Sequence, residues 1–283
     1  MAKNTFGEEL RRWRNKRGRS QLELAAQAGY SQRHLSFLES GRSKPSRKTV
    51  LNLVEALDVP VHARNGLLQS AGFAPVFSAE PISSDALRFA LQGLSKVLDS
   101  HRPFPALIVD RAWNMYAANL NALVLFNMFT AEPIEVSIEQ PLNVLEMSLS
   151  ENGIRTSIQN WPEFASIFVA QLKRDLEHDP ADELLAGLIH RFGADPELRA
   201  YQNSQATPPP APFATITFAR NGVQARLMTL VSQFAAPADS TLASLRVETF
   251  FPADQATREL LHELDRQHFA TANADPQVMW LQQ

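Results

Sequence analysis

The segment SQLELAAQAGYSQRHLSFLESGRSKP, residues 20–45, predicts two short helices joined by a tight turn. Ser20 and Glu23 have the spacing of a capping box, in which each side chain bonds the other residue's backbone N–H. Gly29 ends the first helix, because glycine tolerates left-handed backbone, and Ser31 can cap the second. The expected helices cover residues 21–28 and 32–39. Two helices arranged in this way are typical of a helix-turn-helix unit.

The flanking sequence extends this pair to a bundle of five helices. An apolar residue every three to four positions predicts a first helix over 6–16. A fourth is expected over about 45–57, with a proline in its first turn, and a fifth over 62–71. Ala25 and Gly29 are expected where the second and third helices approach each other closely. The first 72 residues are therefore predicted to be all-α.

The charge of the chain is divided unevenly along its length. The 283 residues carry 27 Lys and Arg against 30 Asp and Glu, a net charge of −3. Residues 1–72 hold 13 basic and 6 acidic residues, a net +7, whereas residues 73–283 hold 14 and 24, a net −10. A basic module beside an acidic one favours a polyanionic partner such as nucleic acid. A solvated basic face without a partner is the alternative.

Composition excludes several classes of protein. There is no cysteine, which excludes disulfides, thiolate metal sites and a cysteine nucleophile, and which fits a cytoplasmic protein. The N-terminus has no apolar run of the kind found in signal peptides, and no segment is apolar for long enough to cross a bilayer. Residues 73–84 contain two prolines and no helical periodicity. We therefore expect domains at 1–72 and 85–270, a linker at 73–84 and a tail at 271–283.

The N-terminal motifs resemble the XRE, or lambda-repressor-like, helix-turn-helix family. The resemblance rests on residues 21–25, 29–31 and 35–46. It implies that Gln21 contacts DNA phosphate and that the exposed start of the third helix reads bases. Gln and Arg suit that role, because they can form two hydrogen bonds with adenine and guanine respectively. The DNA-binding residues expected are Gln21, Ser31, Gln32, Arg33, Ser36, Arg42, Ser43 and Lys44. His34 faces outward and could either read bases or brace the helix, while Arg11, Arg12 and Arg14 are expected on a solvated helix face.

The remainder of the chain predicts an α+β domain with an antiparallel sheet. Helices are expected over 85–100, 119–129, 161–177, 181–192, from 196 and over 254–268; strands are expected over 105–109, 112–117, 213–220, 223–234 and 241–251. Asn221-Gly222 is a strong signal for a two-residue hairpin. Apolar and polar residues alternate in the last two strands, which predicts a sheet with one apolar face. That pattern places Glu248 and Arg246 opposite the face formed by Val247 and Thr249.

This second part resembles the MmyB-like regulators. The resemblance rests on residues 106–113, 117–119, 160–161 and 242–254. It implies a PAS-like ligand-binding domain after the helix-turn-helix bundle. Residues 130–141 match the family less well.

Aromatic residues of this part could line an apolar cavity, although for any single one a place in the core is favoured. The resemblance to the MmyB-like regulators implies a small apolar ligand. A fatty-acid-like ligand is expected, and Arg155, Arg226 and Arg246 are candidates to hold its carboxylate. The expected ligand-binding residues are Trp113, Tyr116, Phe126, Phe129, Trp161, Phe168, Arg226 and Arg246. No cofactor, metal site or catalysis is expected, because the histidines are scattered and the His262-Glu263 pair lacks a second histidine four residues after the first.

The sequence thus predicts a cytoplasmic transcription regulator without a membrane segment. It would bind double-stranded DNA at a palindromic operator as a homodimer, since two half-sites need two reading helices. An apolar ligand in the second domain would control this binding. The alternative is a helix-turn-helix protein whose second domain is a protein–protein interaction or dimerisation module without a small ligand.

Overall fold

The structure, a computed structural model, describes residues 5–81, 84–134, 142–149, 153–178, 182–204, 215–234 and 239–269. Contacts divide the chain into two units, and each is considered by itself. The first unit comprises Met1–Ile82, Leu172–Gly187 and Ala236–Ala243; the second comprises Ser83–Gln171, Leu188–Ala235 and Ser244–Gln283. Within the described residues, no helix is long and apolar enough to cross a membrane.

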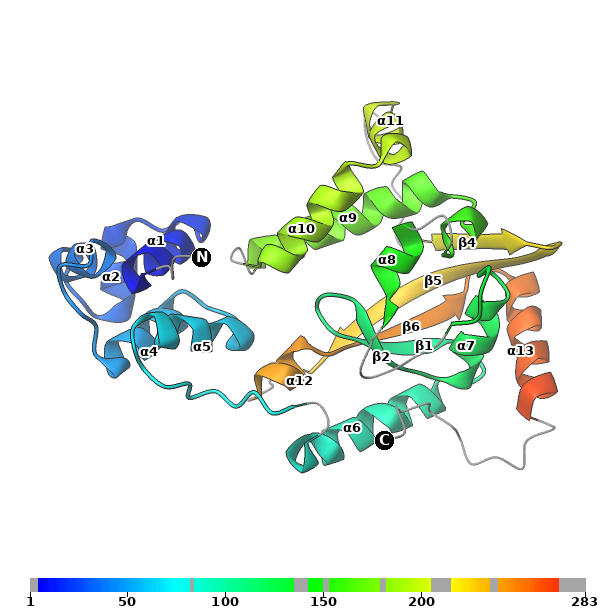
Figure 1. Ribbon diagram of the computed structural model, residues 1–283, viewed down its shortest axis with the longest axis horizontal. Coiled ribbons are helices and arrows are strands. Elements are labelled where there is room, and N and C mark those ends of the chain that lie inside the picture. The colour runs from blue at the N-terminus through cyan, green and yellow to red at the C-terminus, as the bar shows by residue number, and fades with distance from the viewer. Residues whose placement is uncertain are drawn as a thin grey trace. The chain divides into compact units, whose positions relative to one another are not determined.

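Five helices form the N-terminal bundle, coloured blue to cyan in Figure 1. They are α1 (Phe6–Lys16), α2 (Gln21–Ala28), α3 (Gln32–Glu39), α4 (Arg47–Ala56) and α5 (Val61–Ser70). Their core includes the buried side chains Phe6, Leu10, Trp13, Leu24, Leu35, Leu38, Val50, Leu53, Leu67 and Leu68. The predicted all-α bundle is confirmed, and the bounds of α2 and α3 agree with the prediction.

Side-chain caps explain where the first four of these helices begin. Ser20 and Glu23 form the expected capping box, and Ser31 Oγ accepts a hydrogen bond from the backbone N–H of His34. The fourth helix was expected to begin at Pro45, which is wrong. Ser46 instead accepts a hydrogen bond from the backbone N–H three residues later and caps a helix beginning at the next residue.

Glycine has two different roles in this bundle. Gly29 was expected at a close approach of two helices, but no atom lies within 4 Å of where its Cβ would be. Its φ of +76° shows that it serves to end α2. The close approach lies elsewhere, because a Cβ on Gly7 of α1 would sit 2.6 Å from the carbonyl oxygens of Leu38 and Glu39.

The first part of the expected linker folds onto the bundle. Phe73 and Phe77 pack against its core. Asn65 on α5 accepts hydrogen bonds from the backbone N–H groups of Val76 and Phe77 and donates one to the carbonyl oxygen of Phe77. The ordered N-terminal fold therefore extends beyond Gly72.

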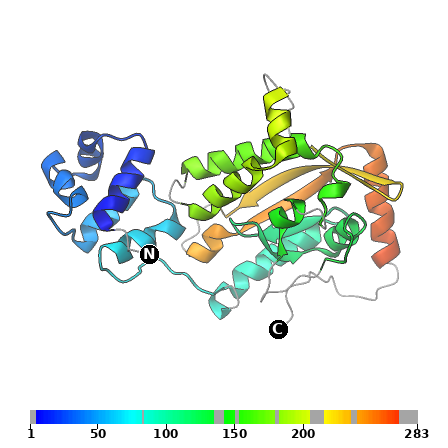
Figure 2. The ribbon, with the colours of Figure 1, turned by 45° about the horizontal axis from the view of Figure 1, so that its top comes forward.

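A six-stranded antiparallel sheet organises the second unit, in the order β3-β2-β1-β6-β5-β4 (Figures 1 and 2). The strands are β1 (Ala106–Val109), β2 (Asn114–Ala118), β3 (Leu142–Asn143), β4 (Thr215–Arg220), β5 (Val223–Gln233) and β6 (Arg246–Pro252). The helices that follow the bundle are α6 (Asp85–Ser100), α7 (Leu120–Asn127), α8 (Val144–Leu149), η1 (Arg155–Ser157), α9 (Trp161–His178), α10 (Glu183–Gly193), α11 (Pro196–Ser204), α12 (Ser240–Ser244) and α13 (Gln255–Phe269). The predicted α+β class with an antiparallel sheet is confirmed.

Several local predictions about this sheet are confirmed and others are wrong. Asn221 and Gly222 both have positive φ and join β4 to β5 as the expected two-residue turn. The last strand was expected to begin at Thr241, but residues 240–244 form α12, because Asp239 accepts hydrogen bonds from the backbone N–H groups of Thr241 and Leu242. The elements β3, α8 and η1 were not predicted, and residues 213–214 of an expected strand lie outside the described residues.

The sheet is buried on both faces near β6, so the prediction of a single apolar face is wrong there. Residues Val247–Phe250 are buried in succession. Phe251 points to the side where the His101 ring, at the end of α6, lies 4.9 Å from its ring centroid. Because side chains alternate along a strand, Glu248 and Phe250 point to the opposite side, where a cavity lies.

Candidate DNA interface and ligand cavity

The start of α3 presents exposed polar side chains. Gln32 and Arg33 are exposed immediately after the capping Ser31. The Arg33 and Arg42 guanidinium carbons lie 5.3 and 5.9 Å from the Phe37 ring centroid, so one ring orients both cations. Of the expected DNA-binding residues, Ser31, Gln32, Arg33, Arg42 and Lys44 are exposed, while Gln21, Ser36 and Ser43 are half-buried.

A buried carboxylate fixes the three helices behind this surface. Glu39 is 4% exposed and accepts hydrogen bonds from Arg14 Nε at 2.5 Å, Arg14 Nη2 at 3.0 Å and Gln21 Nε2 at 2.8 Å. Desolvation opposes its ionisation, but these hydrogen bonds outweigh it and hold its pKa below the ordinary value. Placing Arg14 on a solvated face was therefore wrong. The phosphate contact of Gln21 stays a prediction. One N–H of its side-chain amide binds Glu39, and the other N–H would have to donate to the phosphate.

His34 contributes to the support of α3. Its ring centroid lies 5.4 Å from that of Tyr30, in the turn between α2 and α3. The Tyr30 hydroxyl in turn accepts a hydrogen bond from Asn52 Nδ2 at 3.1 Å. Of the two roles left open for His34, this contact favours bracing.

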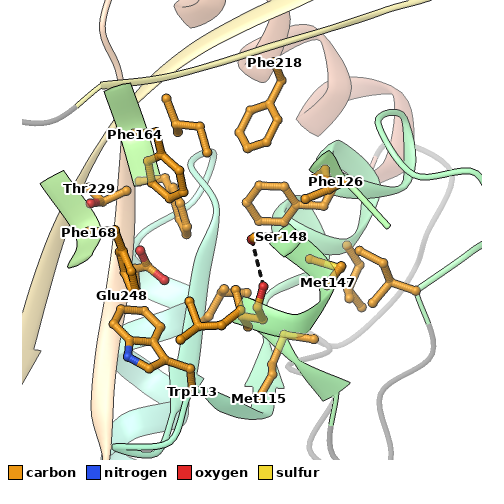
Figure 3. A pocket seen from close by; sticks show the side chains of 18 residues that line it. Trp113, Met115, Phe126, Met147, Ser148, Phe164, Phe168, Phe218, Thr229 and Glu248 are labelled. Carbon is orange, nitrogen blue, oxygen red and sulfur yellow. Dashed lines mark hydrogen bonds between the residues drawn. The ribbon is translucent and has the colours of Figure 1, made fainter. Parts of the chain in front are cut away.

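An apolar cavity lies in the second unit, between the sheet and α7, α8 and α9 (Figure 3). Its volume is about 50 Å³, several times the roughly 10–15 Å³ that one water molecule needs. It is lined by Leu107, Trp113, Met115, Leu123, Phe126, Ile134, Val144, Leu145, Met147, Ser148, Ile154, Phe164, Phe168, Ile216, Phe218, Thr229, Glu248 and Phe250. Such a surface favours an apolar ligand.

Three of the predicted ligand-binding residues, Trp113, Phe126 and Phe168, line this cavity. Trp113 projects from a tight turn with φ +66°, a conformation that non-glycine residues seldom adopt. Asp110 holds that turn, because its Oδ1 accepts hydrogen bonds from the backbone N–H groups of Ala112 and Asn114. The Trp113 indole meets the Phe168 ring edge to face, with centroids 4.7 Å apart.

The other predicted ligand-binding residues are not among those that line the cavity: Tyr116, Phe129, Trp161, Arg226 and Arg246. Tyr116 donates a hydrogen bond from its hydroxyl to Asp110, and Phe129 is fully buried against Phe218. For Phe129, the structure therefore favours the alternative that it belongs to the core.

The remaining candidate for a carboxylate anchor, Arg155, has other partners. Its guanidinium binds Asp195 at 2.5 Å and Glu197 at 2.7 Å, and it lies 4.5 Å from the Trp161 ring centroid. It joins η1 to α11 and does not line the cavity. No Lys, Arg or His is found among the described residues that line the cavity, and a ligand carboxylate would find no cation there.

Glu248 is the one ionisable side chain among the described residues that line the cavity. It is 7% exposed, and desolvation raises its pKa to about 8. None of the described residues hydrogen-bonds to its carboxyl group, and no charge contributes to this shift. Glu248 was not among the residues predicted for the site, because alternation along the strand placed it on a polar face.

Comparison with known proteins agrees with this architecture. Residues 91–264 match the family described as MmyB-like transcription regulator ligand binding domain, and residues 10–62 match the helix-turn-helix family. The first match covers more than half of the chain. The chain therefore belongs to the MmyB-like family and carries a helix-turn-helix domain of the XRE type at its N-terminus, and both resemblances seen in the sequence are confirmed.

Similarity to individual proteins is concentrated in shorter segments. An HTH-type transcriptional regulator of Mycobacterium bovis is 33% identical over 94 residues, which are 32% of this chain and 37% of that protein. One of Mycobacterium tuberculosis matches to the same extent. Another, of Sinorhizobium fredii, is 42% identical over 53 residues, 19% of this chain and 69% of that protein. The match thus spans little more than a third of the mycobacterial proteins.

Proposed function

We propose that the protein is a transcription regulator whose helix-turn-helix domain binds specific DNA and whose second domain binds a small apolar ligand. The observation that supports this most strongly is the exposed, cation-bearing start of α3 in a chain that also carries an MmyB-like ligand-binding domain. Membership of this family points to a regulator and not to an enzyme. Binding to bacterial DNA would place the protein in the cytoplasm.

DNA recognition is assigned to α3 and the loop that follows it. Gln32 and Arg33 would contact base edges in the major groove, while Lys44 and Arg42 would contact phosphates. The basic character of residues 1–72 supports this assignment, since neutralising phosphate charge dominates affinity. We also propose that the protein binds a palindromic operator as a homodimer, because two half-sites one helical turn apart need two reading helices.

The ligand is proposed to be a molecule with a fatty-acid-like chain. The aromatic and aliphatic lining of the cavity suits an alkyl chain, each buried methylene of which contributes about 0.8 kcal/mol. A long chain exceeds the present 50 Å³, so the cavity would have to widen. Met115 and Met147 are well suited to this, because methionine side chains are flexible. The PAS-like character of this domain likewise stays a proposal.

DNA binding can be tested by selecting, from a pool of random DNA sequences, those that the full chain binds. Gel shift then measures the affinity of the chain for the selected site and for unrelated DNA. The double variant Gln32→Ala/Arg33→Ala should lose preference for the selected site while keeping salt-dependent binding to unrelated DNA. Lys44→Ala should weaken binding to all sequences and flatten the dependence of affinity on salt. Arg258→Ala, on α13, is the matched control and should change neither. Unchanged sequence preference in the double variant would show that α3 does not read bases.

A further inference from the structure

The buried carboxyl group of Glu248 lies at the apolar cavity without a polar partner among the described residues. It comes from the middle of β6, where the neighbours across the sheet are Leu107 on β1 and Val231 on β5. Neither can hydrogen-bond to it through its side chain. Figure 3 shows the carboxyl group among the side chains that surround the cavity. Buried polar groups are almost always hydrogen-bonded, so this one requires an explanation.

A second polar group lies on the same face of the sheet. Thr229 of β5 also lines the cavity. It pairs across the strands with Phe250, two residues beyond Glu248, so the side chains of Thr229 and Glu248 are diagonal neighbours. Two other polar groups line the cavity. The Ser148 hydroxyl already donates to the Val144 carbonyl at 2.8 Å, whereas the Trp113 indole Nε1 is buried without a hydrogen-bond partner among the described residues. The groups left to meet the polar end of a ligand are therefore the Glu248 carboxyl, the Thr229 hydroxyl and the Trp113 indole N–H, and the first two lie beside each other on the sheet.

The lining also determines which head group fits. A ligand anion would find no cation among the described lining residues and would lie beside a carboxyl group. An ammonium group would have to lose its hydration, and Glu248 would have to release a proton, before the two could pair. An uncharged hydroxyl or carbonyl oxygen needs neither change, because a protonated carboxyl group donates a hydrogen bond to it.

We propose that Glu248, in its protonated form, is the polar anchor of this cavity and that the ligand presents an uncharged oxygen to it. This rests on the proposed function, since it assumes that the cavity binds an apolar ligand. Thr229 would supply the second hydrogen bond to the same oxygen. A fatty acid would bind here as the protonated acid and would take up a proton from solution if it entered as the anion.

The test compares three ten-carbon ligands that differ only in their head group, decanol, decylamine and decanoate. Displacement of a neutral naphthylamine dye from the full chain is measured between pH 6 and pH 9. Decanol should bind most tightly at neutral pH, and its apparent affinity should fall about tenfold per pH unit above about pH 8, as Glu248 loses its proton. Decanoate should bind progressively more weakly from pH 6 upward.

Two variants separate the anchor from the rest of the cavity. Glu248→Gln keeps a hydrogen-bond donor and should bind decanol at every pH without the loss above pH 8. Glu248→Leu should weaken decanol about tenfold while leaving dye binding intact. Glu259→Gln changes an exposed carboxyl group on α13 and should leave the pH profile unchanged.

Each alternative gives a different result. Decylamine binding that exceeds that of decanol and tightens between pH 6 and pH 8 would overturn the proposal, because Glu248 would then be a counterion. Decanoate binding that persists above pH 8 would overturn it as well. Equal displacement by all three ligands in wild type and in Glu248→Leu would refute the anchor and leave the apolar cavity standing. Absence of any dye or ligand binding would refute the proposed ligand-binding role of the second domain together with this inference, and would leave the proposed DNA binding standing.

Discussion

Replacing Glu248 by glutamine should stabilise the second unit, by an amount that grows with pH. Burial raises the pKa of this carboxyl group from the ordinary 4.5 to about 8. Between these values the unfolded chain releases the proton and the folded chain keeps it, so folding becomes less favourable as the pH rises. Below 4.5 both states are protonated and no penalty exists. Above about 8 both are ionised and the penalty is constant.

The size of the effect follows from the same two values. Each pH unit between them costs about 1.4 kcal/mol, which makes the penalty about 3 kcal/mol at pH 7 and about 5 kcal/mol above pH 8. Glutamine has almost the same shape and does not titrate, so Glu248→Gln removes the penalty. At about 2–4 °C per kcal/mol for a unit of this size, the melting temperature should rise by about 8 °C at pH 7.

The measurement is thermal or urea unfolding of wild type and Glu248→Gln at several pH values from 4 to 9. The decisive quantity is the slope of the difference in unfolding free energy, because a constant offset could arise from packing of the amide. The exposed Glu259→Gln variant should show no such slope. A difference that is the same at pH 5 and at pH 8 would refute the reasoning and would mean that Glu248 is ionised in the folded state.

Three further predictions concern packing and hydrogen bonding. Gly7→Ala should destabilise the N-terminal bundle by about 1–3 kcal/mol, because its Cβ would overlap backbone oxygens of α3, and thermal unfolding should detect this. The bundle should lose stability as the pH falls below 4.5, because the pKa of Glu39 is lowered in the folded state and the ionised carboxylate therefore stabilises the fold. Hydrogen exchange of the α1 amides should show this loss in wild type and should not show it in Glu39→Gln. Asn119→Ala should cost about 3 kcal/mol or more in urea unfolding, since its buried amide bonds the backbone of Ala106, Ala122, Leu98 and Phe104.

Elements that are fixed by local hydrogen bonds could be predicted from the sequence. Ser20 and Glu23 satisfy backbone groups of their own helix, so this helix start depends little on the rest of the chain. Asn221-Gly222 is comparable, because its two positive φ angles favour a two-residue turn. The bundle and the hairpin were accordingly predicted correctly.

Features that depend on distant contacts could not be predicted in this way. The alternation of apolar and polar residues from Thr241 onward indicates a strand, yet Asp239 caps a helix there. The Asp239 carboxylate also accepts a hydrogen bond from the backbone N–H of Glu80, which is far away in sequence. Likewise, Trp161 and Trp113 are both aromatic residues after a turn, but only Trp113 lines the cavity. Which aromatic side chain faces a cavity depends on which helices cover the sheet.

Glu248 is a further residue whose environment depends on distant contacts, and it shows why the site was incompletely predicted. Two charged residues at alternate positions, here Arg246 and Glu248, usually indicate a solvated face of a strand, but residues of α8 and α9 line the cavity on that face of β6. A buried carboxyl group of this kind lowers stability at neutral pH, and an apolar residue or glutamine would avoid that cost. A ligand that hydrogen-bonds to the protonated group gains affinity from the same burial, because the bond forms away from water. The destabilisation and the proposed anchoring role are therefore two consequences of one placement, and the Glu248→Gln variant measures both.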